Sequence, residues 1–309
     1  MHHKHNGTAI ITALFIMAIV AIAATAMSMR LSIDIQRSAL TLTSQRLTGL
    51  ASGVNAWAQQ QLLASLKKPN DGLPLTMTPQ LYAGAEVSGQ LDDLQARFNL
   101  NNLRLTDKPD DNNYYQTAFA RLLEIVAPGK FSHEVAKQLT ANVVSWLSPN
   151  AAAIEQSYLK LNPPYRAAHQ LMVSASELRL VAGFNAERYL VLAPFITALP
   201  AISTPINLNT ASAEVLTTLG AGLSLAQAKA IVAARKAQHG FNSLAEFNQS
   251  AIGKSIHIPS NEITFKSQFF SSQAWVKQGR QEFMLTTTYL RQTQPPSIQV
   301  LWQSLGDFY

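Results

Sequence analysis

The sequence TAIITALFIMAIVAIAATAMSM, residues Thr8 to Met29, is mostly apolar and contains no charged side chain. As an α-helix with a rise of about 1.5 Å per residue, this stretch is about 33 Å long. The hydrocarbon core of a bilayer is about 30 Å thick, so a helix of this length crosses it. The stretch therefore predicts a transmembrane helix over residues 8–29.

A short leader, MHHKHNG, precedes the apolar stretch, and Lys4 is its one full charge. A secretory signal peptide usually has a shorter apolar core, followed by a cleavage site made of small residues. Here the candidate cleavage residue, Gly7, comes before the apolar stretch, an arrangement that resembles the leaders of type IV prepilins. The resemblance implies that a prepilin peptidase cuts after Gly7, that the new N-terminus at Thr8 is methylated, and that the helix is kept. An ordinary single-pass anchor is the alternative.

The charges around the apolar stretch indicate its orientation. Lys4 and three leader histidines lie on one side, and Arg30 follows on the other. Because positive charge is enriched on the cytoplasmic side of membrane proteins, we expect the N-terminus inside and the C-terminal bulk of the chain outside.

Composition limits the classes of function. The 309 residues suffice for an anchor and roughly two soluble domains. The net charge is +6 but only 14% of residues are charged, so no basic face of the kind that dominates nucleic-acid affinity stands out. The absence of cysteine excludes disulfides, thiolate metal sites and cysteine nucleophiles.

The helix is expected to continue through residues 30–68 as an amphipathic segment. Five apolar residues recur there at helical spacings and form one stripe: Leu40, Leu47, Leu50, Val54 and Trp57. A helix that is apolar all round in its first half and amphipathic in its second half has two environments, lipid or other subunits first and its own domain second. Pilin subunits are built in this way. Proline, asparagine and glycine between residues 69 and 74 then end the helix.

Residues 82–105 have a short, strand-like pattern that contains DDLQARFNLNNL, residues 92–103. This segment resembles the one that follows the first helix in minor pseudopilins of the K class from type II secretion systems. Ala96 departs from the resemblance, because we expect glycine at this position.

Four other segments resemble the same family and occur in the same order along the chain. They are GTAIITAL (7–14), NVVSWL (142–147), NPPYRAAHQLMVSASELRLVAGF (162–184) and INLNTASAEVL (206–216). Five separated matches in order are far more specific than any one of them.

The family resemblance and the residue pattern together predict an α+β, pilin-like fold. An antiparallel sheet is expected from residues 75–109 and 255–309, and it packs on the amphipathic half of the first helix. KQGR (277–280) is predicted to form a hairpin turn, and IQVLWQSL to form a strand after Pro295–Pro296. Residues 110–254 are expected to form a large α-helical insertion domain that the sheet brackets.

Helix-start signals recur within the insertion. Ser174 with Glu177, Ser224 with Gln227, and Ser243 with Glu246 have the spacing of capping boxes. Residues 173–196 and 210–234 are alike, because each has a Ser/Thr-rich start, a glycine turn and a final apolar helix. These units predict a compact bundle that resembles SAM-like or helix-hairpin-helix domains.

The helix-hairpin-helix resemblance also raises a DNA-binding alternative, a membrane-anchored receptor for DNA uptake. Gly220 and Gly222 would let backbone N–H groups approach a phosphate at a helix N-terminus. Further phosphate contacts would come from Lys229, Arg235, Lys236 and His239. Without a basic stripe, nucleic-acid binding is the weaker interpretation.

No motif predicts an enzyme or a metal centre. DKPDDNN (107–113) reads as a loop, and its Asp110, Asp111 and Asn113 do not match the calcium-loop template. His133 begins HEVAK, in which Lys137 replaces the second histidine of a zinc-protease motif. The other histidines outside the leader, His169, His239 and His257, are isolated in sequence.

The family resemblance raises one further metal question. In K-class pseudopilins the stretch after the tryptophan of NVVSWL is usually acidic and is associated with calcium. Here only Ser148, Asn150 and Glu155 remain as ligand candidates, so we expect no cofactor and do not transfer that site.

The resemblance implies a non-catalytic subunit at the tip of a pseudopilus, which helps initiate assembly and protein export across the outer membrane. Its implied partners are minor pseudopilins of the I and J classes, the major pseudopilin and the inner-membrane secretion platform. It would cross the bacterial inner membrane once, with a cytoplasmic N-terminus and a periplasmic C-terminal domain. Major pilin subunits carry a glutamate five residues into the mature chain, whereas this position is the neutral Thr12.

Overall fold

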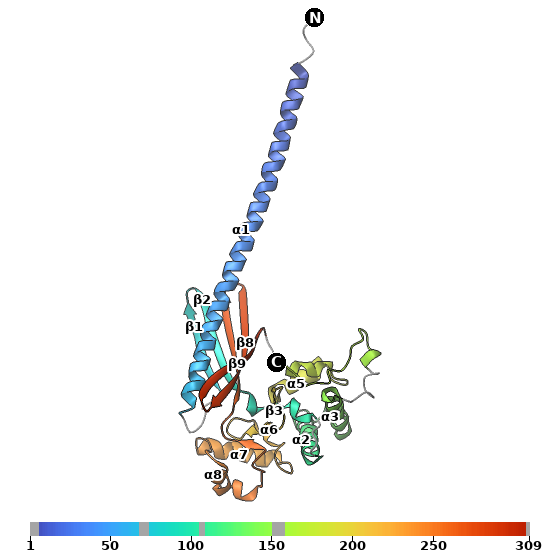
Figure 1. The fold of residues 1–309 in the computed structure, drawn as a ribbon, viewed down its shortest axis with the longest axis vertical. Coiled ribbons are helices and arrows are strands. Elements are labelled where there is room, and N and C mark those ends of the chain that lie inside the picture. Colours follow the sequence, from blue (N-terminus) through green and yellow to red (C-terminus); the bar gives the residue numbers. More distant parts are fainter. Residues whose placement is uncertain (1–5, 68–73, 105–108, 150–157, 307–309) are drawn as a thin grey trace. The chain divides into compact units, whose positions relative to one another are not determined.

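The structure is a computed structural model of the chain, which describes residues 6–67, 74–104, 109–149 and 158–306, with side chains from residue 8 onward except 109–113. Backbone contacts divide it into two compact units, residues 1–50 and 51–309. One helix, α1 (Asn6–Ser65), has residues in both units (Figure 1). In the first unit the apolar side chains of α1 from Ile10 to Leu42 are exposed, as expected for a surface that faces lipid or other subunits.

The second part of α1 is amphipathic, but its buried stripe differs in part from the expected one. The buried residues are Leu47, Ala51, Val54, Ala58 and Leu62. The prediction is confirmed at Leu47 and Val54, whereas Leu40 is 57% exposed and Leu50 and Trp57 are half-buried. A seven-residue spacing drifts by about 20° per repeat around a straight α-helix, so equally spaced leucines do not stay on one face.

Five antiparallel strands of the described residues form the main sheet, in the order β1-β2-β7-β8-β9 (Figure 1). Their bounds are β1 (Leu75–Tyr82), β2 (Ala85–Asp93), β7 (Phe269–Gln278), β8 (Gln281–Thr293) and β9 (Pro296–Leu305). The pairing of β2 with β7, from Glu86 with Lys277 to Asp93 with Phe270, joins strands that are far apart in the sequence. The predicted sheet and the bracketed insertion are thereby confirmed.

The predicted KQGR turn connects β7 to β8. Gln278 pairs with Gln281, which leaves Gly279 and Arg280 as a two-residue loop. Gly279 has a φ of +60° at the first central position, where a β-branched or bulky residue would be strained.

The final part of α1 packs directly on the sheet. Ala58 and Leu62 form a buried cluster with Leu91, Phe270 and Tyr289. At the end of the helix, the buried Arg291 guanidinium donates to Ser65 Oγ and to the Ser267 carbonyl oxygen, each at 2.6 Å. Helix and sheet therefore share both an apolar core and a buried polar anchor.

The helical insertion lies between β2 and β7. Its first part contains η1 (Leu94–Ala96), β3 (Phe98–Asn99), η2 (Leu100–Leu103), α2 (Pro109–Val126), α3 (His133–Leu147), η3 (Ala175–Leu180), α5 (Ala186–Leu192), η4 (Ala193–Phe195) and β4 (Ile196–Thr197). Its second part contains β5 (Ile206–Asn207), α6 (Ala213–Leu216), α7 (Leu225–Ala237), α8 (Leu244–Gln249), η5 (Gly253–Ser255) and β6 (Ile263–Thr264).

Among the described residues, the buried apolar side chains of the insertion form two clusters. One cluster extends from Phe98 to Ala198 and the other from Ile206 to Ile263. Short parallel strand pairs, β3 with β4 and β5 with β6, close the two parts. The packing of the insertion therefore extends beyond the expected 110–254 at both ends.

Two local predictions were wrong. Pro109 to Asn113 form the first turns of α2 and not a loop, because proline at the first helical position followed by acidic residues favours a helix N-terminus. Ile263 and Thr264 pair with β5 and stay outside the main sheet. Ala96, where glycine was expected, ends η1 without strain, since helical dihedrals suit alanine.

The capping predictions are confirmed at two of the three sites. Ser174 with Glu177 and Ser224 with Gln227 form complete capping boxes. Ser243 caps α8 through the Glu246 N–H, but the Glu246 carboxylate accepts from the Asn242 N–H. The third site is therefore half of the expected box.

Candidate functional site

The N-terminal part of α1 carries the residues predicted to act in processing and assembly. Gly7 lies in the first turn of the helix, which begins at Asn6, and Thr8 and Thr12 are exposed. The Thr12 hydroxyl donates to the backbone carbonyl oxygens of Thr8 and Ala9, at 3.1 and 3.0 Å. Because its hydroxyl is satisfied within its own helix, Thr12 needs no partner in an apolar environment. Cleavage after Gly7 and methylation at Thr8 stay predictions.

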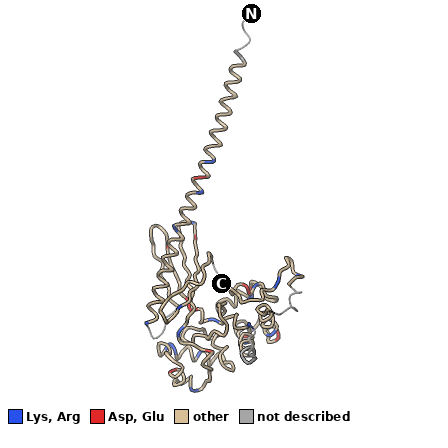
Figure 2. Tube along the Cα trace, in the orientation of Figure 1, with Lys and Arg blue, Asp and Glu red and all other residues tan. Residues whose placement is uncertain are grey.

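α1 is long and apolar enough to cross a membrane, by its length and composition. Charged residues appear along it only after the apolar stretch, beginning with Arg30, Asp34 and Arg37 (Figure 2). The rise of about 1.5 Å per residue places Arg30 about one bilayer core away from Thr8.

Asp93 is the centre of a buried polar junction between the sheet and the insertion. Its Oδ2 accepts from Asn207 Nδ2 at 2.9 Å, Thr210 Oγ1 at 2.5 Å and Ser267 Oγ at 2.7 Å. Its Oδ1 accepts from the Gln95 N–H at 2.8 Å. One carboxylate thus holds the end of β2, the start of the second helical part and the chain that leads into β7.

Three asparagines extend the junction into the first helical part: Asn99, Asn101 and Asn102. Asn101 is fully buried, and its Nδ2 donates to the carbonyl oxygens of Met172 and Leu199 at 2.9 and 2.7 Å. Asn99 Oδ1 accepts from the Leu199 N–H at 3.0 Å, and Asn102 bonds the backbone of Thr204 in both directions. These amides satisfy backbone groups that short strands leave unpaired.

The junction explains two of the sequence resemblances. DDLQARFNLNNL supplies Asp93 and the three asparagines, and INLNTASAEVL supplies Asn207 and Thr210. Sequence reasoning recognised both segments without assigning them a structural role. The feature of the sequence that could have revealed the junction is the high content of Asp and Asn in both segments, because these short polar side chains often bond to backbone groups.

The predicted helix-hairpin-helix segment has α6 and α7 on either side of the Gly220–Gly222 turn. The Gly220 N–H, which the DNA alternative assigns to a phosphate, donates to Glu262 Oε2 at 2.6 Å. Arg121 of α2 donates to the carbonyl oxygens of Thr217 and Ala221 at 3.4 and 3.2 Å. A Cβ atom at Gly222 would overlap the Arg121 guanidinium. The turn is therefore filled by side chains of its own chain.

Arg235, a second group of the DNA alternative, is also used internally. Its Nη1 donates to the carbonyl oxygens of Leu208 and Ala211 at 2.8 and 2.6 Å, and burial lowers its pKa. Lysines and arginines are scattered over the described part of the insertion in Figure 2 and do not gather in a stripe. Gly220 and Arg235 are thus both engaged in hydrogen bonds within the chain.

Glu262 has an unusual electrostatic environment for an acidic residue. Burial raises its pKa, while hydrogen bonds from the Gly220 N–H and from Tyr114 oppose the shift. Burial also raises the pKa of the Tyr114 hydroxyl, and the Glu262 carboxylate adds to this effect. The Glu262 carboxylate therefore accepts from the Gly220 N–H that a phosphate would need, although its burial disfavours the ionised form.

The histidines of the insertion do not converge on one site. His133 Nδ1 bonds Glu124 Oε1 at 2.8 Å, and His169 Nδ1 bonds the Ser148 carbonyl oxygen at 2.7 Å. Within the part of the chain that the structure describes, no group of three His, Cys, Asp or Glu residues is placed to hold a metal. The side chains of Asp110, Asp111, Asn113, Asn150 and Glu155 lie outside the described residues.

Known proteins are similar to this chain in sequence and in fold. Two family profiles described as type II secretion system protein K match residues 96–201 and 206–266. The type II secretion system protein K of Klebsiella pneumoniae is 30% identical, over 82% of each chain. The protein K of Pseudomonas aeruginosa is 29% identical, over 99% of this chain and 94% of the relative.

A solved structure, the GspK-GspI-GspJ complex from the enterotoxigenic Escherichia coli type 2 secretion system, contains a chain of the same fold. The TM-score is 0.71 at 18% identity, with coverage of 88% of this chain and 99% of the other. A long apolar helix, an antiparallel five-stranded sheet and a helical insertion define a minor pseudopilin. More narrowly, the chain belongs to the type II secretion system protein K family.

Proposed function

We propose that this chain is a non-catalytic minor pseudopilin at the tip of a type II secretion pseudopilus. There it helps initiate pseudopilus assembly and protein export across the outer membrane. The observation that carries the proposal is the neutral, internally bonded Thr12 on a pilin-like helix. A carboxylate in the membrane is costly unless it is paired, and in pilin-type assembly its partner is the N-terminal amine of a neighbouring subunit. A subunit without that carboxylate has no need of a neighbour above it.

The helical insertion supports a position at the end of a fibre. It adds a bulky region between β2 and β7 that a subunit in the middle of a close-packed fibre would have to accommodate. A terminal subunit has a neighbour on one side only, so the insertion meets no next subunit.

The proposed partners follow from the family and from the solved complex. Minor pseudopilins of the I and J classes would share the tip, by analogy with the E. coli complex, in which GspK is bound to GspI and GspJ. The major pseudopilin, the inner-membrane secretion platform and a prepilin peptidase complete the set. The chain would cross the inner membrane once, with its N-terminus in the cytoplasm and its C-terminal domain in the periplasm.

Intact-mass measurement of the membrane-expressed chain, with and without a prepilin peptidase, tests the pathway. We expect loss of residues 1–7 and the addition of one methyl group at Thr8, only when the peptidase is present. A Gly7→Asp variant serves as the control and should stay unprocessed. A chain that keeps its leader beside an active peptidase would contradict the proposal and favour a plain membrane anchor.

Co-purification with I-class and J-class pseudopilins tests the position in the assembly. The processed chain, extracted in detergent, should elute with both partners in one complex. Salt-sensitive duplex binding without such a complex would instead favour the DNA-receptor alternative.

A further inference from the structure

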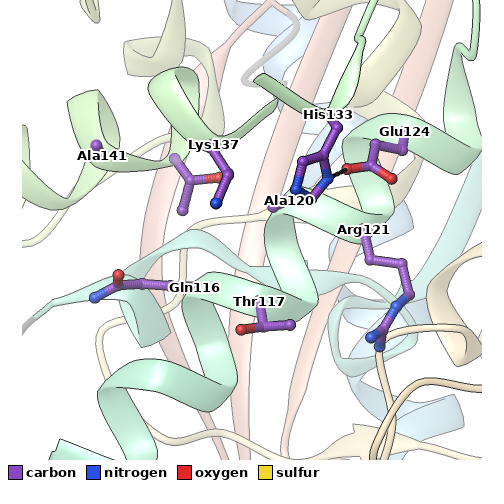
Figure 3. A pocket seen from close by; sticks show the side chains of 9 residues that line it. Gln116, Thr117, Ala120, Arg121, Glu124, His133, Lys137 and Ala141 are labelled. Atoms are coloured by element: carbon purple, nitrogen blue, oxygen red, sulfur yellow. Dashed lines mark hydrogen bonds and ion pairs between the residues drawn. The ribbon is translucent and has the colours of Figure 1, made fainter. Parts of the chain in front are cut away.

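The helices α2 and α3 leave a cleft of about 400 Å³ between them (Figure 3). One face of each helix lines it. Ala120 and Ala141, two of the lining residues, are small, and Ala120 is almost completely buried. The small side chains of these two residues leave room in the cleft for a side chain from outside.

The charges at this cleft are unbalanced. Figure 3 shows His133 and Glu124 joined by the 2.8 Å contact between Nδ1 and Oε1, so the acidic residue of the lining already has a partner. Arg121 is bonded to two carbonyl oxygens of the α6–α7 turn. Because carbonyl groups carry only partial charges, these bonds leave the full positive charge of Arg121 uncancelled.

Lys137 is the cationic side chain of the lining that has no bonding partner among the described side chains. It is exposed on α3 and faces the cleft, and within the described side chains no hydrogen bond or ion pair engages its ammonium. Together with the Arg121 guanidinium, the Lys137 ammonium gives the lining two positive charges against the one carboxylate of Glu124, and this excess of positive charge attracts a further carboxylate. The cleft therefore combines room for one side chain with charge complementarity to an acidic one.

We propose that the α2–α3 cleft is a docking site for an acidic segment of a partner protein, with an Asp or Glu carboxylate bound by Lys137. The single open ammonium favours a protein carboxylate over nucleic acid, because duplex binding is dominated by several basic residues that contact successive phosphates. The inference does not depend on the position of the chain in a pseudopilus.

Fluorescence anisotropy with the full chain in detergent micelles tests the proposal. The probe is a labelled twelve-residue peptide with glutamate at every third position among glycine and serine, and its glutamine counterpart is the peptide control. Lys137→Gln should weaken binding of the acidic peptide about fivefold, the upper end of what one exposed ion pair contributes. Lys254→Gln removes the same charge from an exposed site on η5 and should change binding less than twofold.

A second variant tests the shape of the cleft without a change in charge. Ala141→Trp should narrow the cleft and weaken the acidic peptide by a similar factor, with an unchanged thermal unfolding midpoint. Equal effects of Lys137→Gln and Lys254→Gln would show binding by net charge alone and overturn the proposal. It would also be overturned by no preference for the glutamate peptide, or by Lys137-dependent binding of duplex DNA that is tighter than peptide binding.

Discussion

Among the single residues of this protein, Asp93 and Glu262 are two buried carboxylates with opposite surroundings. Asp93 accepts four hydrogen bonds from donors on three separate stretches of chain. Glu262 accepts from the Gly220 N–H, but burial raises its pKa above the ordinary 4.5. The first carboxylate is well compensated for its burial, and the second is compensated only in part.

Asp93→Asn should lower the free energy of unfolding by about 2–4 kcal/mol. The amide places an N–H₂ group where three donors already converge, so buried groups lose their partner. Denaturant unfolding of the full chain in detergent, followed by tryptophan fluorescence, measures the change. Asp92→Asn is the matched control, because Asp92 bonds the Gln90 side chain at a half-buried site. Equal losses in both variants would contradict the role of the junction.

Glu262→Gln should flatten the pH dependence of stability. The folded state binds the Glu262 proton more tightly than the unfolded state, since the pKa of this group is raised on folding. Its contribution is therefore present below about pH 4.5 and is lost as the pH rises through the folded-state pKa. Unfolding measured from pH 4 to pH 8 should show a smaller decline in the variant. The exposed Glu282→Gln should retain the full decline, and an equal decline in both variants would refute the expectation.

Among the elements, the contact of α1 with the sheet depends on close approach rather than on large side chains. Ala51 and Ala58 occupy the buried stripe beside Val54 and Leu62. Gly89 of β2 lies directly beneath the helix, where a Cβ atom would overlap Val54 Cγ1. Small residues on both surfaces bring the helix and strand backbones together.

Gly89→Ala should therefore destabilise the fold by about 1–3 kcal/mol, as overpacking of a close contact does. Gly53→Ala is the matched control within α1, because nothing lies within 4 Å of the added atom. This control should be neutral or stabilising by up to about 1 kcal/mol, owing to the better helix propensity of alanine.

The double variant Gly89→Ala with Val54→Ala tests the cause of the effect. Removing the Val54 methyl groups makes room for the new Cβ, so the two changes should be less harmful together than their separate effects predict. Thermal or denaturant unfolding of all four proteins completes the cycle. Strict additivity would show that the overlap with Val54 is not the source of strain.

At the scale of the whole molecule, the chain combines a long, partly apolar helix with a sheet that carries the helical insertion between β2 and β7. The junction around Asp93 ties the insertion to the sheet, because this residue of β2 bonds Asn207 and Thr210 across sequence separations of 114 and 117 residues. Thr12 lies in the other unit, on the part of α1 whose apolar side chains are exposed.

Thr12→Val should leave assembly intact under the proposed function. The Thr12 hydroxyl bonds carbonyl oxygens of its own helix, and valine has a similar shape without the polar group. Co-purification of the variant with I-class and J-class pseudopilins measures the outcome. Thr25→Val removes a hydroxyl that also bonds its own helix, at Ala21, and is the matched control. A defect confined to Thr12→Val would contradict a passive role for this position.

Much of the architecture was predictable because it depends on local patterns. The uncharged stretch from Thr8 to Met29 predicts the helix, and the Gly279 turn between alternating segments predicts a hairpin. The capping residues Ser174 and Ser224 mark helix starts that the structure confirms. Leader cleavage, methylation and the role of Thr12 stay predictions.

The sequence by itself determined the long apolar helix, the class of fold and the family, because periodicity, caps and ordered motifs are properties of neighbouring residues. Only the tertiary structure decided that Gly89 of the sheet lies against Val54 of the helix, and that Asp93 and Asn207 form one junction. It alone showed that Glu262 occupies the Gly220 turn. These contacts join residues far apart in the chain, and their energies depend on burial and distance, which no local pattern contains.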